Sequence, residues 1–403
     1  MDEPLYVTIK TDEEDFMGFQ ALVPTRMQKM AEAPDTQIQP EVPYINKLAA
    51  RLHPPKQMLK VESIKELTPT IKLIRFRRED DGELAFFRPG QYITVDMKIG
   101  ESLITRPYSI ASSPADSLEG YYELAVRDDE NGFAAKYLYN ELKVGDVLKT
   151  SGPAGQFYWD SIRDLRSVIG IAGGSGITPF RSMARAIADG TIDCNMTLFY
   201  GTNTEDDIAF HDEFVELEKK SNGKFKAVFV LANEEKEGYE HGFVTTDVID
   251  RHADAKASSI FICGPQGMYS FLQKEIAKYG LRRKFVRFEL FGQPRQISSE
   301  EGFPQDQVGK TYTVTVHQAD KTYRIPAKSE ETLVTAMERA GIRPPTKCRS
   351  GACGFCRSML VEGDVYVSKK DDGRRYGDRN FGFIHPCSSF PISDCELIVP
   401  PAK

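Results

Sequence analysis

The chain has 403 residues, 40% of them hydrophobic and 28% charged, which excludes a fibrous or wholly disordered protein and allows about two to four domains. Its net charge of -7 supplies no basic excess for a phosphate backbone, so nucleic acid is not an expected partner. No segment reaches the roughly 18 to 20 uninterrupted apolar residues that span a bilayer, and Met1-Asp2-Glu3 does not begin a signal peptide; we expect a cytoplasmic protein without a membrane span.

Residues 1–54 are predicted to form an N-terminal extension. Its start is rich in acids, and most of it lacks sustained hydrophobic periodicity. The exception is Ile45, Leu48, Ala49 and Leu52, which share one face of a short helix that ends at Pro54-Pro55. The extension either packs on the rest of the chain as a tail or docks a partner.

Residues 55–157 have the short, alternating pattern of antiparallel strands. Segments 60–64, 70–76 and 91–95 alternate apolar and polar residues and are separated by Pro-Gly and Asp-Asp-Gly turns. This pattern predicts an antiparallel β-barrel.

Residues 158–292 change to apolar runs that are each followed by a helix-like stretch. The runs are 168–172, 197–200, 227–231 and 260–263. Such alternation predicts a doubly wound parallel sheet, here a nucleotide-binding domain.

Residues 293–309 are rich in Gln, Ser, Glu and Pro and are predicted to be a linker. Residues 310–403 are predicted to form a small last domain, with β segments at 312–317 and 322–325 followed by a helix. Ser329 is expected to cap the start of this helix and Gly341 to end it. With its cysteine-rich loop, the domain is predicted to be β-grasp-like, which makes the whole chain an α/β and β multidomain protein.

Four cysteines have a spacing that is specific for one kind of metal centre. The pattern is C-x4-C-x2-C-x30-C, and the expected ligands are Cys348, Cys353, Cys356 and Cys387. This is the plant-type 2Fe-2S arrangement, and Gly351 and Gly354 suit a loop that folds closely around a cluster.

Zinc is the alternative for four cysteines, but structural zinc sites usually pair two short CxxC-like knuckles and only one is present. His385 precedes Cys387 by two residues, yet a Rieske centre replaces two cysteines by two histidines. Cys194 and Cys395 lie in apolar sequence and are expected to be buried thiols.

Further motifs occur in a fixed order before the cysteines. Arg106-Pro107-Tyr108-Ser109 follows Pro89-Gly90-Gln91-Tyr92, and Gly173-Gly174-Ser175-Gly176-Ile177-Thr178-Pro179 joins an apolar strand to a helix. A glycine-rich turn at a helix start offers free N–H groups to a pyrophosphate, although this one is not GxGxxG. Cys263-Gly264-Pro265 ends a later strand of the same sheet.

In these motifs the chain resembles ferredoxin-NADP reductase-like flavoproteins that carry a plant-type ferredoxin domain at the C-terminus, over about residues 57–403. The resemblance implies that Arg106 holds a flavin phosphate, that Tyr108 packs on the isoalloxazine and that Ser109 lies near flavin N5. It implies catalytic roles for Ser109, Thr178, Cys263 and Glu289. The residues implied to bind flavin or nucleotide are Arg106, Pro107, Tyr108, Ser109, Gly132, Ala134, Ala135, Gly173, Gly174, Ser175, Gly176, Thr178, Pro179, Cys263, Gly264, Pro265 and Phe291.

One departure concerns the second flavin-phosphate loop. Asn131-Gly132-Phe133-Ala134-Ala135 has no Ser where the family often has one, so backbone N–H groups would have to serve. The continuation of the first motif as Ile110-Ala-Ser-Ser-Pro114 favours FAD, and FMN stays open.

The expected function is an NAD(P)H-dependent reductase that passes hydride to flavin and then single electrons, through the 2Fe-2S cluster, to a redox acceptor protein such as an oxygenase. Glu205, Asp206 and Asp207 follow a strand without a nearby Lys or Arg, which favours NADH unless they only cap the next helix. The basic residues either steer the acceptor or form an ordinary solvated loop; they are Lys369, Lys370, Arg374, Arg375 and Arg379. Two alternatives are an NADH-oxidising subunit of a multisubunit complex and a redox-sensing iron-sulfur flavoprotein.

Overall fold

The computed structural model describes residues 13–32, 43–129, 132–290, 292, 296–368 and 372–402. The chain divides into two compact units, one ending at Ala49 and the other starting at Ala50. The first unit contains helix α1 (Glu13–Glu32), which the sequence analysis missed, and helix α2 (Tyr44–Leu52) spans the division. Helix α2 is the predicted short helix, and none of its residues is buried. No helix among the described residues is long and apolar enough to cross a membrane.

The first domain of the second unit is an antiparallel sheet with strand order β4-β3-β6-β1-β2-β5. Its elements are β1 (Lys56–Thr68), β2 (Ile71–Arg78), β3 (Tyr92–Ile99), β4 (Ser102–Ser109), α3 (Pro114–Leu118), β5 (Tyr122–Arg127), α4 (Phe133–Asn140) and β6 (Val147–Ser151). A bridge between Ile110 and Leu124 connects the two outer strands. The sheet therefore curves into the predicted barrel, and apolar residues such as Leu59, Ile93 and Tyr122 fill its inside.

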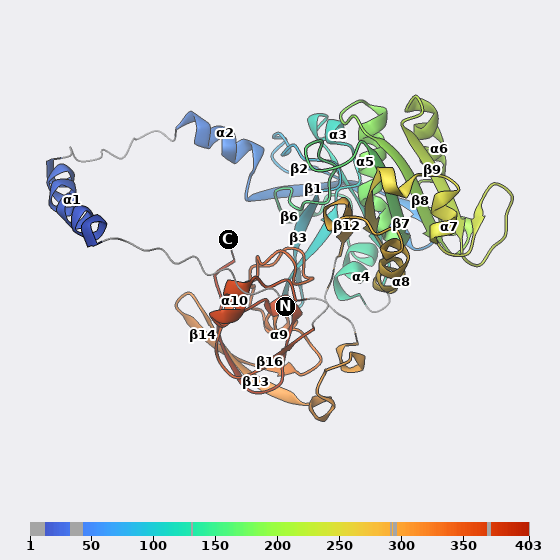
Figure 1. The fold of residues 1–403 in the computed structure, drawn as a ribbon. Helices are drawn as coiled ribbons and strands as arrows, with labels where there is room; N and C mark the ends of the chain where they lie inside the picture. Colours follow the sequence, from blue (N-terminus) through green and yellow to red (C-terminus); the bar gives the residue numbers. More distant parts are fainter. Residues whose placement is uncertain are drawn as a thin grey trace. The chain divides into compact units, whose positions relative to one another are not determined.

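The second domain is a parallel sheet with strand order β10-β9-β8-β7-β11-β12 (Figure 1). Its strands are β7 (Ser167–Gly173), β8 (Asn195–Thr202), β9 (Phe225–Leu231), β10 (Glu240–His241), β11 (Ser258–Cys263) and β12 (Val286–Glu289), and its helices are α5 (Thr178–Ala188), α6 (His211–Lys220), α7 (Thr246–Asp250) and α8 (Gln266–Ala277). The strand order reverses between β7 and β11, as in a doubly wound sheet, so the predicted fold class is confirmed.

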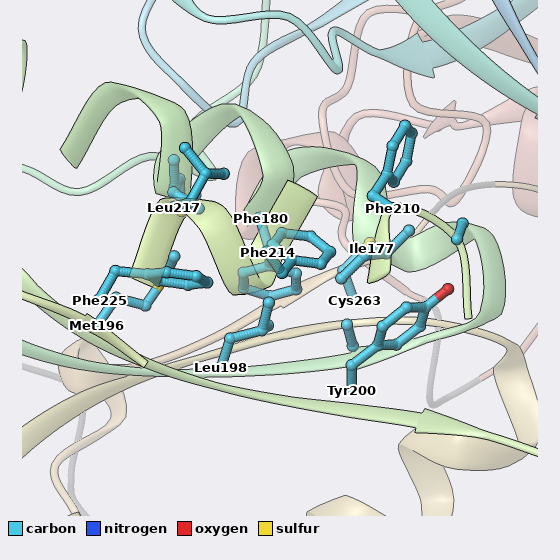
Figure 2. Packing of buried hydrophobic residues seen from close by; sticks show 14 of the residues in the cluster. Ile177, Phe180, Met196, Leu198, Tyr200, Phe210, Phe214, Leu217, Phe225 and Cys263 are labelled. Atoms are coloured by element: carbon cyan, nitrogen blue, oxygen red, sulfur yellow. The ribbon is translucent and has the colours of Figure 1, made fainter. Parts of the chain in front are cut away.

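Two apolar clusters cover the two faces of this sheet. Phe180 of α5 and Phe214 of α6 pack on one face with Leu198 and Tyr200, as Figure 2 shows. Helices α7 and α8 pack on the other face with Ile169 and Ile171 of β7. Because β7 is covered on both faces, its sequence is an uninterrupted apolar run.

The last domain contains a five-stranded sheet of order β14-β13-β19-β15-β17 and the pair β16-β18. Its elements are β13 (Thr311–Gln318), β14 (Lys321–Lys328), α9 (Leu333–Arg339), β15 (Ser358–Glu362), β16 (Val365–Val367), α10 (Tyr376–Asn380), β17 (Phe383–Ile384), β18 (Ser389–Pro391) and β19 (Cys395–Ile398). Helix α9 buries Leu333, Val334, Ala336 and Met337 against this sheet.

Two expectations about this region need correction. Ser329 does not cap α9, because the helix begins four residues later and the Thr332 hydroxyl accepts the N–H of Thr335 instead. The predicted linker is also not a bare connection, since Ile297 and Phe303 are buried with Phe390 of the last domain. The division of the chain at residues 54, 157, 292 and 309 stays a prediction.

Candidate functional site

The cysteine loop lies between α9 and β15, and Cys387 lies in a short 3-10 turn, Pro386–Ser388. All four thiols are free, and their sulfurs form two pairs. The Sγ atoms of Cys356 and Cys387 are 3.3 Å apart, and Cys353 bonds to the sulfur of Cys348. Within the described residues, no three His, Cys, Asp or Glu side chains surround one position for a single ion. Two irons that each take two thiolates require such pairs.

Backbone N–H groups of the loop point at these sulfurs. Cys348 accepts from the N–H of Ser350 at 3.5 Å and of Cys353 at 3.4 Å, and Cys387 accepts from Gly351 at 3.3 Å. The thiol of Cys353 and these N–H groups lower the pKa of Cys348 to about 5. Donors aimed at sulfur stabilise thiolates, so the loop fits the 2Fe-2S cluster that its spacing predicted.

The local backbone explains the residue types in this loop. Arg349, Gly351 and Gly354 have φ values of 61°, 77° and 69°, in the left-handed region. Two glycines meet that requirement without strain, and Arg349 is held there by the bonds described below. His385 holds the loop from the other side, since its Nδ1 lies 2.6 Å from the carbonyl oxygen of Gly351. Sequence reasoning considered His385 only as a metal ligand and missed this role.

The first flavin motif lies on β4, where it pairs with β3. Tyr92 is paired with Ser109 and Ile93 with Tyr108, so the two halves of the predicted flavin site are adjacent across the strands. Burial raises the pKa of Tyr108. The half-buried Tyr108 ring therefore stays neutral and keeps an exposed part, as a flavin-stacking ring requires.

Arg106, the predicted phosphate ligand, bonds to the last domain through Nη1, which lies 2.9 Å and 3.1 Å from the two carboxylate oxygens of Glu338. Pro107 follows it on the same strand. In its hydrogen bonds to other described residues, Arg106 donates only through Nη1. Its Nε and Nη2 groups are therefore available for a phosphate.

The second flavin loop begins helix α4. Gly132 is the N-cap, Ala134 is buried and Ala135 is half-buried, while Asn131 lies outside the described residues. The first N–H groups of a helix have no partner inside it, so this end can serve an anion by backbone alone. A Cβ on Gly132 would lie 2.7 Å from the Asp129 side chain, which explains the glycine.

The glycine-rich turn leaves the carboxyl end of β7 as a 3-10 turn, Gly174–Ile177, and continues into α5, whose first residues are Thr178 and Pro179. The Thr178 hydroxyl donates to the carbonyl oxygen of Ser175 at 2.6 Å. A Cβ on Gly176 would lie 2.2 Å from the carbonyl oxygen of Cys263. The glycine is therefore required for contact between the turns after β7 and β11.

A second turn lies beside the first at the same edge of the sheet. The site for a Cβ on Gly173 is 2.7 Å from the sulfur of Met268 and 3.0 Å from Pro265, and one on Gly264 would also meet Met268. Cys263 pairs with Ala172 on one side and with Glu289 on the other. All these residues thus lie at the carboxyl ends of β7, β11 and β12, where doubly wound sheets bind ligands.

Glu289 and Cys263 are both poorly solvated. Burial, with a smaller effect of Cys348, raises the pKa of Glu289 to about 8. Burial also raises the pKa of the Cys263 thiol, so Cys263 is a neutral side chain rather than a thiolate. Phe291, the other predicted residue of this segment, lies outside the described residues.

Tyr92 lies on the flavin strand β3 and is 3% exposed. Its backbone is bridged to Ala154, and its ring lies 2.8 Å from the position of a Cβ on Gly155. Gly155, with a φ of 104°, therefore leaves room for this ring. Burial raises the pKa of Tyr92.

Sequence reasoning missed two cationic residues near these sites. Arg127, at the end of β5, is exposed, and its Nη1 lies 2.8 Å from the position of a Cβ on Gly174. This places a guanidinium against the dinucleotide turn, where a pyrophosphate would lie. Arg181 of α5 instead crosses to the barrel, where it bonds to Glu123 at 2.7 Å and to the Ala111 carbonyl oxygen at 3.1 Å.

The fold and site define a two-domain flavin and nicotinamide oxidoreductase with an iron-sulfur domain. Three family models match the chain in this order: "Oxidoreductase FAD-binding domain" over residues 58–159, "Oxidoreductase NAD-binding domain" over 171–274 and "2Fe-2S iron-sulfur cluster binding domain" over 316–391. The chain belongs to the ferredoxin-NADP reductase-like flavoproteins with a C-terminal 2Fe-2S domain, as predicted.

Curated relatives share this organisation. The chain is 27% identical over 331 residues to a glycine betaine monooxygenase reductase subunit of Pseudomonas aeruginosa, which covers 79% of this chain and 88% of the relative. It is 26% identical over 313 residues to the NADH oxidoreductase HCR of Escherichia coli, covering 77% and 88%. The solved structure of phthalate dioxygenase reductase matches with a TM-score of 0.63 and 24% identity over 86% of this chain and 98% of that one, which confirms the fold.

Proposed function

We propose that this oxidoreductase delivers its electrons to an oxygenase component and that NADH is its donor. The observation that carries the proposal is that ion pairs connect the flavin barrel to both other domains, through Arg106 with Glu338 and through Arg181 with Glu123. A flavin would accept hydride as an electron pair and release electrons singly, which a one-electron cluster requires. The names of two relatives, monooxygenase reductase subunits for glycine betaine and for carnitine, support an oxygenase as acceptor.

The protein's own contribution is orientation rather than acid-base chemistry. The turn after β7 would hold the pyrophosphate, and Thr178, fixed by its bond to Ser175, would border the nicotinamide. Ser109 would meet the flavin from β4, and Cys263 and Glu289 would close the far side of the hydride path. The burial of Cys263 would help to keep water from the reacting atoms.

The preference for NADH rests on the segment after β8. Thr204 and Asp207 form a capping box, so Asp207 is engaged in the turn. Glu205 is bonded to Lys236 and to Tyr239. The cation that a 2'-phosphate would need is thus present but neutralised by Glu205, which supports NADH over NADPH.

The acceptor would dock near the exposed Cys353. The large apolar side chains exposed around the cluster domain include Phe355, Tyr376 and Phe381. In the described part of the basic segment, Asp372 pairs with Arg374 and Arg379 and partly neutralises their positive charge. We propose a docking surface of aromatic residues with a moderate positive charge, for a partner with an acidic patch. Lys369 and Lys370 lie outside the described residues.

The proposal is tested with purified protein that contains one flavin, two irons and two acid-labile sulfides per chain. NADH should reduce an oxygenase component that is encoded nearby, and it should do so faster than NADPH. Reduction of artificial one-electron acceptors without reduction of any oxygenase would contradict the proposed acceptor. A cytoplasmic location also stays a prediction, which cell fractionation checks.

A further inference from the structure

One buried carboxylate connects the flavin motif to the last domain. Glu338 lies on α9 and is 2% exposed. On the barrel side, Arg106 donates to both of its oxygens, and the backbone N–H of Thr105 donates to Oε1 at 3.1 Å. The residue predicted to hold the flavin phosphate is therefore anchored on a different domain.

The same carboxylate also anchors the cluster loop. Nη1 of Arg349 lies 2.7 Å from Oε1 of Glu338. Arg349 directly follows the ligand Cys348, is 2% exposed and has a φ of 61°. A residue other than glycine occupies this strained conformation only where its surroundings fix it, and the bond to Glu338 does so.

The network differs from an ordinary contact between domains. Asp96 and Arg343 form a second ion pair across the same two domains, at 3.2 Å, with side chains that are 18% and 26% exposed. Asp96 also accepts a hydrogen bond from the Thr105 hydroxyl, but that pair touches neither Arg106 nor the cluster loop. The carboxylate of Glu338 instead lies between two guanidinium groups, one from each redox site, so a shift of either changes the position that the other prefers.

We propose that Glu338 is a positioning residue that couples flavin binding at Arg106 to the position of the cluster loop at Arg349. The inference rests on the proposed binding of the flavin phosphate by Arg106. Phosphate binding at Nε and Nη2 fixes the guanidinium, Glu338 follows it, and Arg349 holds the loop for electron transfer. In that transfer, the reduced flavin loses one electron and the oxidised cluster gains it.

Equilibrium coupling is reciprocal and can be measured without turnover. FAD is titrated into deflavinated wild-type, E338Q and D96N proteins while flavin fluorescence is followed. We expect the Kd for FAD to rise at least fivefold in E338Q and less than twofold in D96N. Hydrogen exchange of residues 348–356 should slow on FAD addition in wild type and D96N, and should not respond in E338Q.

Kinetics give a second readout. At saturating FAD, stopped-flow traces with NADH separate flavin bleaching from cluster reduction. In E338Q the second step should slow at least tenfold relative to the first, and in D96N the ratio should stay near the wild-type value. If E338Q does not fold with its full iron content, E338D serves, because it keeps the charge but is one methylene too short to reach both arginines.

The outcomes separate the two claims. Equal behaviour of the Glu338 variants and D96N in FAD affinity, exchange and the rate ratio would overturn the coupling and leave the reductase function intact. A wild-type protein that binds no flavin, or whose cluster NADH does not reduce, would overturn the proposed function together with this inference.

Discussion

Removing the charge of Glu123 should loosen the barrel from the nucleotide-binding domain. Glu123 lies on β5, is 3% exposed, and bonds to Arg75 at 2.7 Å and to Arg181 of α5 at 2.7 Å. The substitution Glu123→Gln leaves Arg181 buried with its contacts to Glu213 and to the Ala111 carbonyl oxygen. Removing one partner of a buried ion pair lowers the free energy of unfolding by about 3–5 kcal/mol. Because Arg181 keeps these two other partners, we expect the low end of that range, about 3 kcal/mol.

The size of the effect follows from the number of residues that unfold together. At roughly 2–4 °C per kcal/mol for units of 150–250 residues, the unfolding midpoint should fall by about 6–12 °C. Thermal unfolding followed by flavin fluorescence measures this change. Flavin bleaching by NADH should also slow, by up to roughly 100-fold, because the two domains set the distance between nicotinamide and flavin.

The stabilisation that Glu123 provides should decrease in acid. Burial alone would raise the pKa of Glu123, but the charges and hydrogen bonds of Arg181 and Arg75 outweigh it and lower the pKa. The stabilisation is therefore present at neutral pH and is lost as the pH falls through the folded-state pKa. The difference in stability between wild type and Glu123→Gln should shrink in acid.

The matched control is Glu216→Gln on α6. Glu216 pairs with Lys220 at 3.3 Å, and both side chains are about two-thirds exposed. Such pairs contribute at most about 0.5 kcal/mol, so the midpoint should hardly change. If Glu123→Gln were no more destabilising than Glu216→Gln, and hydride transfer were unaffected, the interface would not position the two domains.

Three further predictions concern the redox sites and their partners. The assigned cluster ligands are Cys348, Cys353, Cys356 and Cys387, and replacing any of them by Ser should remove or destabilise the cluster, as measured by iron analysis and visible spectra. The control variants Cys194→Ser and Cys395→Ser should retain the cluster. The opposite pattern would refute the ligand assignment. Replacing Glu205 by Gln should free Lys236 and raise the kcat/KM for NADPH at least tenfold relative to that for NADH. An unchanged ratio of the two kcat/KM values in steady-state kinetics would show that this turn does not contact the 2'-position of the nucleotide. Reversing the charge of Arg375 and its basic neighbours should slow reduction of the acceptor at low ionic strength, but it should not slow flavin bleaching by NADH. An unchanged rate of acceptor reduction would show that this segment does not take part in docking the acceptor.

The sequence predicted those features that depend on residues close together in the chain. The cysteine spacing and the glycine-rich turn express local geometry, because nearby thiolates must surround a cluster and Gly174 adopts a φ of 51°, which favours glycine. The strands were found for a similar reason, since burial on one or two faces leaves a pattern with a period of two or an apolar run.

Contacts between domains could not be found in this way. Arg181 meets Glu123 across 58 positions and Arg106 meets Glu338 across 232, and no periodicity relates such pairs. The run Ile110–Pro114 was interpreted only as an FAD signal, yet the Ser112 carbonyl oxygen accepts from Ser182 of α5. Helix α1 was missed because Pro24, a residue that disfavours helix interiors, lies within it.

The central claim is that electrons pass from NADH through flavin to a 2Fe-2S cluster within this one chain. The most direct test mixes the purified, oxidised protein with NADH under anaerobic conditions and follows flavin absorbance and the electron paramagnetic resonance signal of the reduced cluster. We predict that flavin bleaches first and that the cluster signal then appears in the same chain without any partner. A flavin that bleaches while the cluster stays oxidised would contradict the account.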